Sequence, residues 1–297
     1  MTAGLKDVQT FWDANPCGAG TVAAEPGTLE FFLQYERYRY ADEPYIQELL
    51  DLDGVRGKRV VEIGCGLGTD GVQFTRAGAL YAGVDLTPVG ARLTYRNHAL
   101  RGLPARTVTA SVEDLGIASS SIDLVYSHGV LHHTPGIDRA VDEIWRILRP
   151  DGRLHLMLYH KHSFNYLVSI QVLRRLGALM LVLPGGMRLA HRLTGEPVAN
   201  LDVHRRRLRE QRLHYLFGPE WLSRNTDGPD SPLARVYSRR TARALLRRFT
   251  DFRFVVTCLN RRHLPLVGQH LPRSAERWLA ARAGWHLHVF ARKRSSV

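Results

Sequence analysis

The sequence predicts an α/β fold built around a mostly parallel sheet, and three observations support this prediction. A short β-branched run, residues 60–63, stops at three glycines spaced G-x-G-x-G. An apolar pattern of helical period follows these glycines. Between residues 58 and 160 strand and helix patterns alternate repeatedly, which is typical of parallel strands joined by right-handed crossovers.

The individual elements follow from the same patterns. We expect the first five strands at residues 58–63, 80–84, 105–109, 122–126 and 152–159. A helix is expected from Thr87 to Leu100, because Pro88 stands in its first turn, where proline is tolerated. A helix beginning after Ser238 leads to two final strands, expected at 252–259 and 285–292, with the last one antiparallel. Upstream of the sheet, helical patterns occupy 8–15, 28–40 and 44–50.

The glycine-rich bend is the first candidate for a binding site. Glycines at 64, 66 and 68 allow positive φ and let a ligand lie against bare backbone, while the following helix offers unpaired N–H groups. The next apolar strand ends at Asp85, about twenty residues further on, where a βαβ unit places a carboxylate against a ribose. A dinucleotide site has the same pattern. Glu62, an acid inside the first strand, favours a ligand that carries positive charge instead.

The composition limits the classes of protein that the chain can represent. With 41 Lys and Arg against 28 Asp and Glu, the net charge is +13. This charge suits nucleic acid, an anionic small substrate or an acidic surface, and equally a basic soluble enzyme without such a partner. The three cysteines show no metal or disulfide spacing, as expected of a reduced cytoplasmic protein. We expect neither a secretory signal nor a membrane span, because no apolar run is long enough.

Three segments resemble the class I S-adenosylmethionine-dependent methyltransferases, specifically the type 11-like group. These segments read EIGCGLG at 62–68 with GVDL at 83–86, SIDLVYSHGVLHH at 121–133, and EIWRILRPDGRL at 143–154. They come in that family's order and at its spacing. The resemblance implies a Rossmann-like seven-stranded methyltransferase sheet, mostly parallel with the last strand antiparallel, with N-terminal helices and a helical cap insertion. It also implies S-adenosylmethionine as the cofactor.

The same resemblance assigns roles on the cofactor side. The first strand and the bend shape the methionine pocket, N-terminal Tyr and Arg side chains reach the methionine carboxylate, and Asp85 accepts both ribose hydroxyls. Ser111 stands where the family usually has an acid for the adenine amino group, and a hydroxyl accepts such a bond more weakly than a carboxylate. The cofactor-binding residues predicted in this way are Tyr35, Arg39, Glu62, Gly64, Gly66, Gly68, Thr69, Asp85, Leu86, Ser111, Val112, Glu113 and Ser127, with Tyr40 as a further candidate.

The residues that bind the methyl acceptor are harder to predict from the sequence. The sulfonium of the cofactor is already activated, so a catalytic base is optional. Candidate catalytic residues, which follow the fourth and fifth strands at the crevice edge of the sheet, are His133, Tyr159 and His160. Candidate substrate-binding residues are Phe11, Trp12, Tyr166 and Trp221. Histidines 128 and 132 are interpreted as packing or capping residues, and no metal is predicted, because the sequence contains no H-E-x-x-H zinc signature.

We expect four regions along the chain. An N-terminal helical lid occupies 1–50, the Rossmann-like cofactor-binding core 51–162, a helical insertion that caps the substrate 163–234, and the C-terminal part of the core sheet 235–297. Residues 204–214 form the densest basic run. This run is interpreted as a solvated helix face, as a contact for an anionic substrate group, or as an RNA-binding stripe.

Two functional classes follow from these expectations. The favoured one is methyl transfer to a small-molecule acceptor, apolar or anionic and of the specialised-metabolite kind, by in-line displacement in a closed pocket. The alternative is an RNA methyltransferase that uses its arginine-rich C-terminal half on phosphates. Nucleic acid is the less favoured partner, because aromatic residues are sparse in the basic run and base stacking has little support. A third option is a non-catalytic or isomerising relative that keeps the fold.

Overall fold

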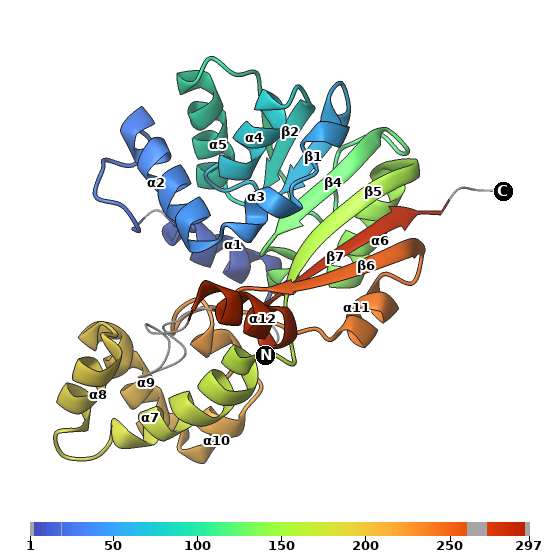
Figure 1. The fold of residues 1–297 in the computed structure, drawn as a ribbon. Helices are drawn as coiled ribbons and strands as arrows, with labels where there is room; N and C mark the ends of the chain where they lie inside the picture. Colours follow the sequence, from blue (N-terminus) through green and yellow to red (C-terminus); the bar gives the residue numbers. More distant parts are fainter. Residues whose placement is uncertain (1–2, 19, 260–271, 295–297) are drawn as a thin grey trace. The chain divides into compact units, whose positions relative to one another are not determined.

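The computed structural model describes residues 3–18, 20–259 and 272–294 (Figure 1). The chain divides into two units, which are treated separately below. The core unit comprises Thr2–Leu158, Arg239–Val255 and His286–Val297, and the helical unit comprises Tyr159–Ser238 and Val256–Trp285. The helical unit therefore contains the whole of the predicted insertion, together with a second segment from near the C-terminus.

Within the described residues, seven strands form one sheet in the order β3-β2-β1-β4-β5-β7-β6. Parallel pairing joins β1 to both β2 and β4, β2 to β3, and β4 to β5, while the last strand runs antiparallel. The predicted fold class is confirmed. The strands are β1 (Arg59–Ile63), β2 (Leu80–Asp85), β3 (Arg106–Thr109), β4 (Ile122–His128), β5 (Leu148–Tyr159), β6 (Phe249–Thr257) and β7 (His286–Lys293).

The central strands are buried on both faces, as a parallel sheet covered by helices requires. In β1, Val60 and Val61 are completely shielded from solvent, and Ile63 at the strand's end lies opposite Val84 of β2. The β-branched side chains pack well on this pleated surface, which explains why the short apolar runs form strands. All five predicted parallel strands are found within a few residues of their expected bounds.

The start of β5 differs from the prediction. We expected the strand from residue 152, but it begins at Leu148. Its pairing with β4 shifts between Ile122, which lies opposite Leu148, and Leu124, which lies opposite Arg153. The intervening turn-forming residues are thus accommodated as a bulge, in which Asp151 has a φ of 61°.

Helices of the core unit cover the sheet. The predicted helix α5 begins at Pro88, and the Thr87 hydroxyl accepts a hydrogen bond from the Gly90 amide as its N-cap. Helix α6 buries a stripe of apolar side chains at helical spacing. These helices are α4 (Thr69–Arg76), α5 (Pro88–Leu100), α6 (Ile137–Ile147) and α11 (Arg239–Leu245), with the short turn η2 (Leu131–His133) before α6.

Helices precede the sheet close to the predicted ranges, and α1 and α2 contact the loops at its carboxyl edge. Phe31, Phe32 and Tyr35 of α2 form a buried cluster with Leu67 of the glycine-rich bend. The Gln9 side-chain amide of α1 donates to the carbonyl oxygen of Leu86 over 2.9 Å. The elements are α1 (Leu5–Ala14), α2 (Leu29–Asp42), α3 (Tyr45–Leu49) and η1 (Asp53–Val55). A lid that opens and closes remains a prediction.

The helical unit is a set of short helices around a small apolar cluster of Leu181, Ala190 and Leu201. Its elements are the π-helix η3 (Asn165–Leu173), α7 (Arg174–Met180), α8 (Gly186–Thr194), α9 (Val198–Gln211), α10 (Leu213–Phe217), η4 (Ser223–Asn225) and α12 (Arg273–Ala283). The basic run, residues 204–214, lies mostly on α9 and ends in the first turn of α10. Helix α9 buries Leu201, His204 and Leu208. Among the described helices of the whole chain, none is long and apolar enough to cross a membrane.

Candidate functional site

The glycine-rich bend connects β1 to α4 at the carboxyl edge of the sheet. Gly64 has a φ of 73°, and a Cβ placed on it would lie 2.1 Å from a methyl carbon of Val130. Gly66 has a φ of 52°, but a Cβ there would meet no heavy atom within 4 Å. Gly64 is therefore required for packing, whereas Gly66 presents bare backbone on an open side where a ligand can approach.

The carboxylate of Asp85 holds this bend in place. Its Oδ2 accepts a hydrogen bond from the Gly66 amide over 2.9 Å, and its Oδ1 accepts from both the amide and the hydroxyl of Thr87, over 2.9 and 2.8 Å. Each carboxylate oxygen has two lone pairs, so Oδ2 keeps the capacity to accept from a ribose hydroxyl. The residue predicted to bind the ribose thus lies beside the open backbone of Gly66, as that role requires.

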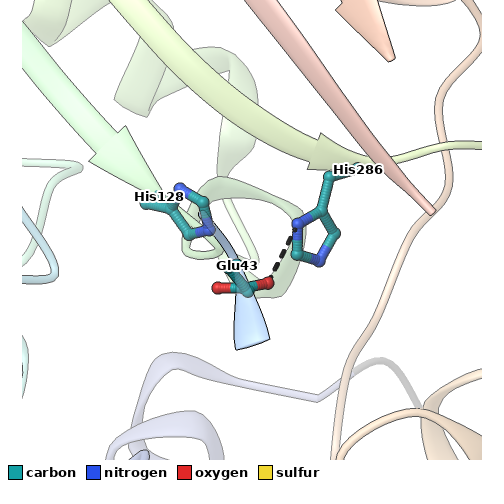
Figure 2. A group of neighbouring side chains, drawn as sticks. All are labelled: Glu43, His128 and His286. Atoms are coloured by element: carbon teal, nitrogen blue, oxygen red, sulfur yellow. Dashed lines mark ion pairs between the residues drawn. The ribbon is translucent and has the colours of Figure 1, made fainter. Parts of the chain in front are cut away.

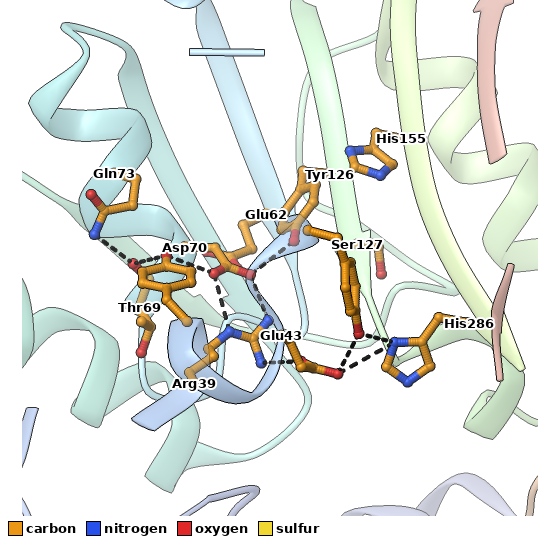
Figure 3. A network of polar contacts seen from close by, with 12 residues as sticks. Arg39, Glu43, Glu62, Thr69, Asp70, Gln73, Tyr126, Ser127, His155 and His286 are labelled. Atoms are coloured by element: carbon orange, nitrogen blue, oxygen red, sulfur yellow. Dashed lines mark hydrogen bonds and ion pairs between the residues drawn. The ribbon is translucent and has the colours of Figure 1, made fainter. Parts of the chain in front are cut away.

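A second acid, Asp70, is the centre of a buried network that the sequence did not reveal (Figure 3). Arg39 donates to both of its carboxylate oxygens, over 3.2 and 2.7 Å. The hydroxyls of Tyr40 and Tyr126 donate to it over 3.0 and 2.8 Å. Burial alone would raise the pKa of Asp70, but the charge of Arg39 and these hydrogen bonds outweigh it and hold the pKa below its usual value.

Arg39 and Tyr40, which were predicted to reach the methionine carboxylate, therefore both contact Asp70. Arg39 also lies 3.7 Å from the carboxylate of Glu43, so it stands between two acids. Tyr35 is buried in the aromatic cluster of α2, and a Cβ on Gly18 would overlap its ring. The structure brings these helix α2 residues to the bend, and their contact with a cofactor remains a prediction.

Glu62, one residue before the end of β1, lies in the same buried region. It accepts a hydrogen bond of 2.6 Å from the Tyr81 hydroxyl. Burial, followed by the nearby charge of Asp70, raises the pKa of Glu62 to about 8. At neutral pH its carboxyl group therefore holds a proton, and the approach of a positively charged group would favour its release.

The residues predicted for the adenine side have partners within the protein. The Ser111 hydroxyl accepts from the amide of Glu113 over 3.1 Å. The Glu113 carboxylate accepts from the amide of Gly136 over 2.9 Å, which ties the third strand's loop to the start of α6. Val112 is buried between these residues. Glu113 thus holds the loop in place, and contacts of Ser111, Val112 and Glu113 with adenine remain predictions.

Three further predicted positions make contacts that involve the backbone. The Ser127 hydroxyl donates to the carbonyl oxygen of Ile63 over 3.0 Å and joins β4 to β1. The carbonyl oxygen of Thr69 accepts from the side chain of Gln73 over 3.4 Å inside α4. Leu86 is half-buried, and its carbonyl is occupied by Gln9, a contact that no sequence pattern indicated.

The acceptor-side candidates of the core unit lie together. The ring of Trp12 in α1 packs edge-on against His133 of η2, with ring centroids 5.3 Å apart. Phe11 packs against Trp12 at 5.0 Å. Two residues predicted to bind substrate and one predicted to act as a base, more than a hundred positions apart in sequence, therefore form one aromatic group.

The remaining candidates belong to the helical unit. The Tyr159 hydroxyl donates to Asp227 over 2.8 Å, and its ring stacks on Trp285. A ring nitrogen of His160 lies 3.1 Å from the carbonyl oxygen of Gly284. The buried Trp221 donates its indole N–H to a π-helix carbonyl over 3.0 Å. The half-buried Tyr166 lies in the first turn of that π-helix, and its amide donates a hydrogen bond to the Ser163 hydroxyl over 3.0 Å. Catalytic and substrate roles for all four remain predictions.

Comparison with known proteins identifies the domain. Residues 61–156 match the family described as a methyltransferase domain. The chain carries a class I S-adenosylmethionine-dependent methyltransferase domain. The cofactor predicted from the sequence, S-adenosylmethionine, is thereby confirmed for this methyltransferase domain.

A solved structure shows the same fold over nearly the full length. It is the magnesium protoporphyrin IX methyltransferase of Synechocystis PCC 6803 with bound SAH, with a TM-score of 0.57 and 14% identity, over 98% of this chain and 100% of that one. At this level of identity the likeness concerns the fold alone.

Two curated relatives are similar over shorter stretches. The phthiotriol/phenolphthiotriol dimycocerosates methyltransferase of Mycobacterium leprae is 38% identical over 100 residues, which are 33% of this chain and 36% of the relative. The fatty-acid O-methyltransferase of Mycolicibacterium smegmatis is 34% identical over 119 residues, 39% of this chain and 42% of the relative. The similarity thus spans well under half the length of either relative.

Proposed function

We propose that the protein transfers the methyl group of S-adenosylmethionine to a lipid-like small molecule. The observation that carries this proposal is the pairing of the open backbone at Gly66 with the carboxylate of Asp85, 2.9 Å from its amide. Bound there, the cofactor supplies an activated methyl group for an in-line displacement. The residues of the chain then have to align the acceptor and exclude water.

On the cofactor side, three acids set the electrostatics. Asp85 supports the ribose through the free lone pair of its Oδ2. Asp70 and Glu62 lie buried in the methionine region, with Arg39 as the balancing cation. A cofactor that carries both a sulfonium and an ammonium group adds positive charge, which suits a region with more acids than bases.

On the acceptor side, Phe11 and Trp12 provide an apolar wall and His133 a titratable group beside it. In the proposed reaction His133 accepts the proton of a hydroxyl or carboxylic acid acceptor as the methyl group is transferred. Histidine is the side chain that most often serves as a general base in enzymes.

The preference for a lipid-like acceptor rests on two further observations. Both curated relatives are named for methyl transfer to lipid or fatty-acid substrates. In the helical unit, apolar side chains are exposed between arginines, and a cleft of about 550 Å³ is lined by Leu181, Val182 and Leu183 together with Arg188, Arg205 and Arg209. Apolar and cationic groups in such proximity suit an amphiphile with an acidic head.

The cofactor site is tested by Asp85→Asn. Replacing the carboxylate weakens a charge-assisted hydrogen bond worth about 1.5–3 kcal/mol, so the Kd for S-adenosylmethionine should rise at least about tenfold. Calorimetric titration measures this change. The matched control is Asp53→Asn, an exposed acid of η1, which should leave the Kd unchanged.

The acceptor class is tested by incubating the protein with methyl-labelled cofactor and separate fractions of long-chain fatty acids, polar metabolites and total RNA. We expect label in the fatty-acid fraction. Label confined to RNA, with binding that weakens steeply as salt increases, would contradict the proposal and support the nucleic-acid alternative.

A further inference from the structure

Three side chains with metal-binding groups meet at the carboxyl edge of β4 (Figure 2). Glu43 follows the last residue of α2, His128 ends β4, and His286 begins β7. One ligand atom of each lies within 4.8 Å of those of the other two. They come from three separate parts of the core unit, so no local sequence pattern connects them.

We propose that Glu43, His128 and His286 form a binding site for one divalent metal ion of the zinc type. Two imidazoles and one carboxylate are a donor set that proteins use for catalytic zinc and for other first-row metals. Three protein ligands leave a coordination position open for water or for an oxygen atom of a substrate. This site is additional to the proposed methyl transfer and can be tested without it.

The distances are compatible with such a site after a small contraction. With metal–ligand bonds of about 2.0–2.2 Å in tetrahedral geometry, ligand atoms lie about 3.4 Å apart. The carboxylate Oε1 of Glu43 is already 3.4 Å from Nδ1 of His286. The imidazole rings of His128 and His286 have centroids 5.5 Å apart and are nearly perpendicular, so a modest rotation of His128 completes the approach.

The environment of His128 and Glu43 favours the binding of a cation between them. Nδ1 of His128 is buried and has no hydrogen-bond partner among the described residues. An imidazole nitrogen without a hydrogen-bond partner is available to coordinate a metal ion. The side chain of Glu43 is only 15% exposed, and a divalent cation would offset the cost of holding a carboxylate there.

Existing contacts already orient two of the proposed ligands. The Tyr45 hydroxyl donates to Glu43 over 2.7 Å and lies 2.8 Å from Nδ1 of His286. Arg39 is the one cation facing Glu43 in the polar network, and its shorter bonds go to Asp70. A metal ion would take over the bridging role between Glu43 and His286 that the Tyr45 hydroxyl group now fills, with Tyr45 as an outer partner.

The test measures metal binding in the full chain without S-adenosylmethionine. Protein treated with EDTA and dialysed is titrated calorimetrically with Zn²⁺, and Co²⁺ binding is followed by its visible absorption. We expect one tight site per chain. The variants Glu43→Gln, His128→Ala and His286→Ala should each lower the affinity at least about a hundredfold, since even loss of an outer partner costs about 10–100-fold.

Matched controls are Glu48→Gln and His162→Ala, which alter an exposed acid and an exposed histidine. Both should bind Zn²⁺ as the unchanged chain does. Circular dichroism establishes that each variant is folded, and Glu43→Gln keeps the side-chain shape if an alanine variant does not fold. The proposal is overturned if the three site variants bind Zn²⁺ as tightly as the controls, or if the unchanged chain shows no stoichiometric site.

Discussion

Replacement of Asp70 by asparagine should destabilise the core unit strongly. The carboxylate accepts four hydrogen bonds, two of them from Arg39, whose side chain is only 15% exposed. Asp70→Asn removes the charge that pairs with the guanidinium, and among the described residues the longer contact to Glu43 is then the remaining ion pair of Arg39. Breaking a buried ion pair in this way costs about 3–5 kcal/mol, because a buried charge is left without its partner.

A double-mutant cycle separates this pairing from a general loss of packing. Arg39→Met removes the cation but keeps most of the apolar stem, and the double variant carries neither charge. We expect the double variant to be more stable than the sum of the two single changes predicts, by at least about 2 kcal/mol. Additive effects would mean that Asp70 and Arg39 do not act as a pair.

The assay should report on the core unit alone, because a chain with two units need not unfold in one step. Amide exchange of α4, followed by mass spectrometry, gives the free energy of opening of the helix that carries Asp70. A loss of 3 kcal/mol accelerates this exchange by about two orders of magnitude. Exchange that changes less than about fivefold in Asp70→Asn would refute the reasoning, and Asp53→Asn serves as the exposed control.

Two other predictions concern the first strand and its bend. The pKa of Glu62 is about 8 in the folded protein, whereas its usual value is 4.5. Between these two pH values the folded state binds more protons than the unfolded state, so the stability of the protein should fall as the pH rises from 4.5 to 8. Glu62→Gln, still able to accept from Tyr81, should flatten the dependence of the melting temperature on pH between 5 and 8, and an unaltered slope would contradict this. For the bend, Gly64→Ala should lower the melting temperature sharply, because its Cβ meets Val130 at 2.1 Å. Gly66→Ala should cost only about 1–2 kcal/mol in backbone strain but weaken cofactor binding, and equal effects of the two variants on stability would contradict the distinction.

The sheet could be predicted from the sequence because its signals are local. The β-branched run of β1 is bounded by turns, and α5 begins where Thr87 and Pro88 provide a cap and a fixed φ. The start of β5 was missed because Pro150 and its neighbours have the composition of a turn, and only pairing with β4 shows that they form a bulge. Local preference is here overridden by the neighbouring strand.

The site was predictable only where a motif runs continuously along the chain. The glycines and Asp85 belong to one βαβ unit, so their proximity follows from spacing. Asp70 was not identified as the partner of Arg39, because these residues meet only once α2 packs on the bend. The approach of Glu43 to His286 depends on β7 lying beside β5, which no residue pattern near either position indicates.

The position of β7 between β5 and β6 constrains how the protein is made. The final strand of the chain is an interior strand of the sheet, and Lys293 donates to the carbonyl oxygen of Leu148 over 2.5 Å. Until residues 286–293 have been added, β6 has no strand to pair with, and β5 is an exposed edge strand of the sheet. Completion of the sheet must therefore wait until residues 286–293 have been synthesised, and nascent chains that stop before these residues would expose unpaired strand edges to chaperones or to one another.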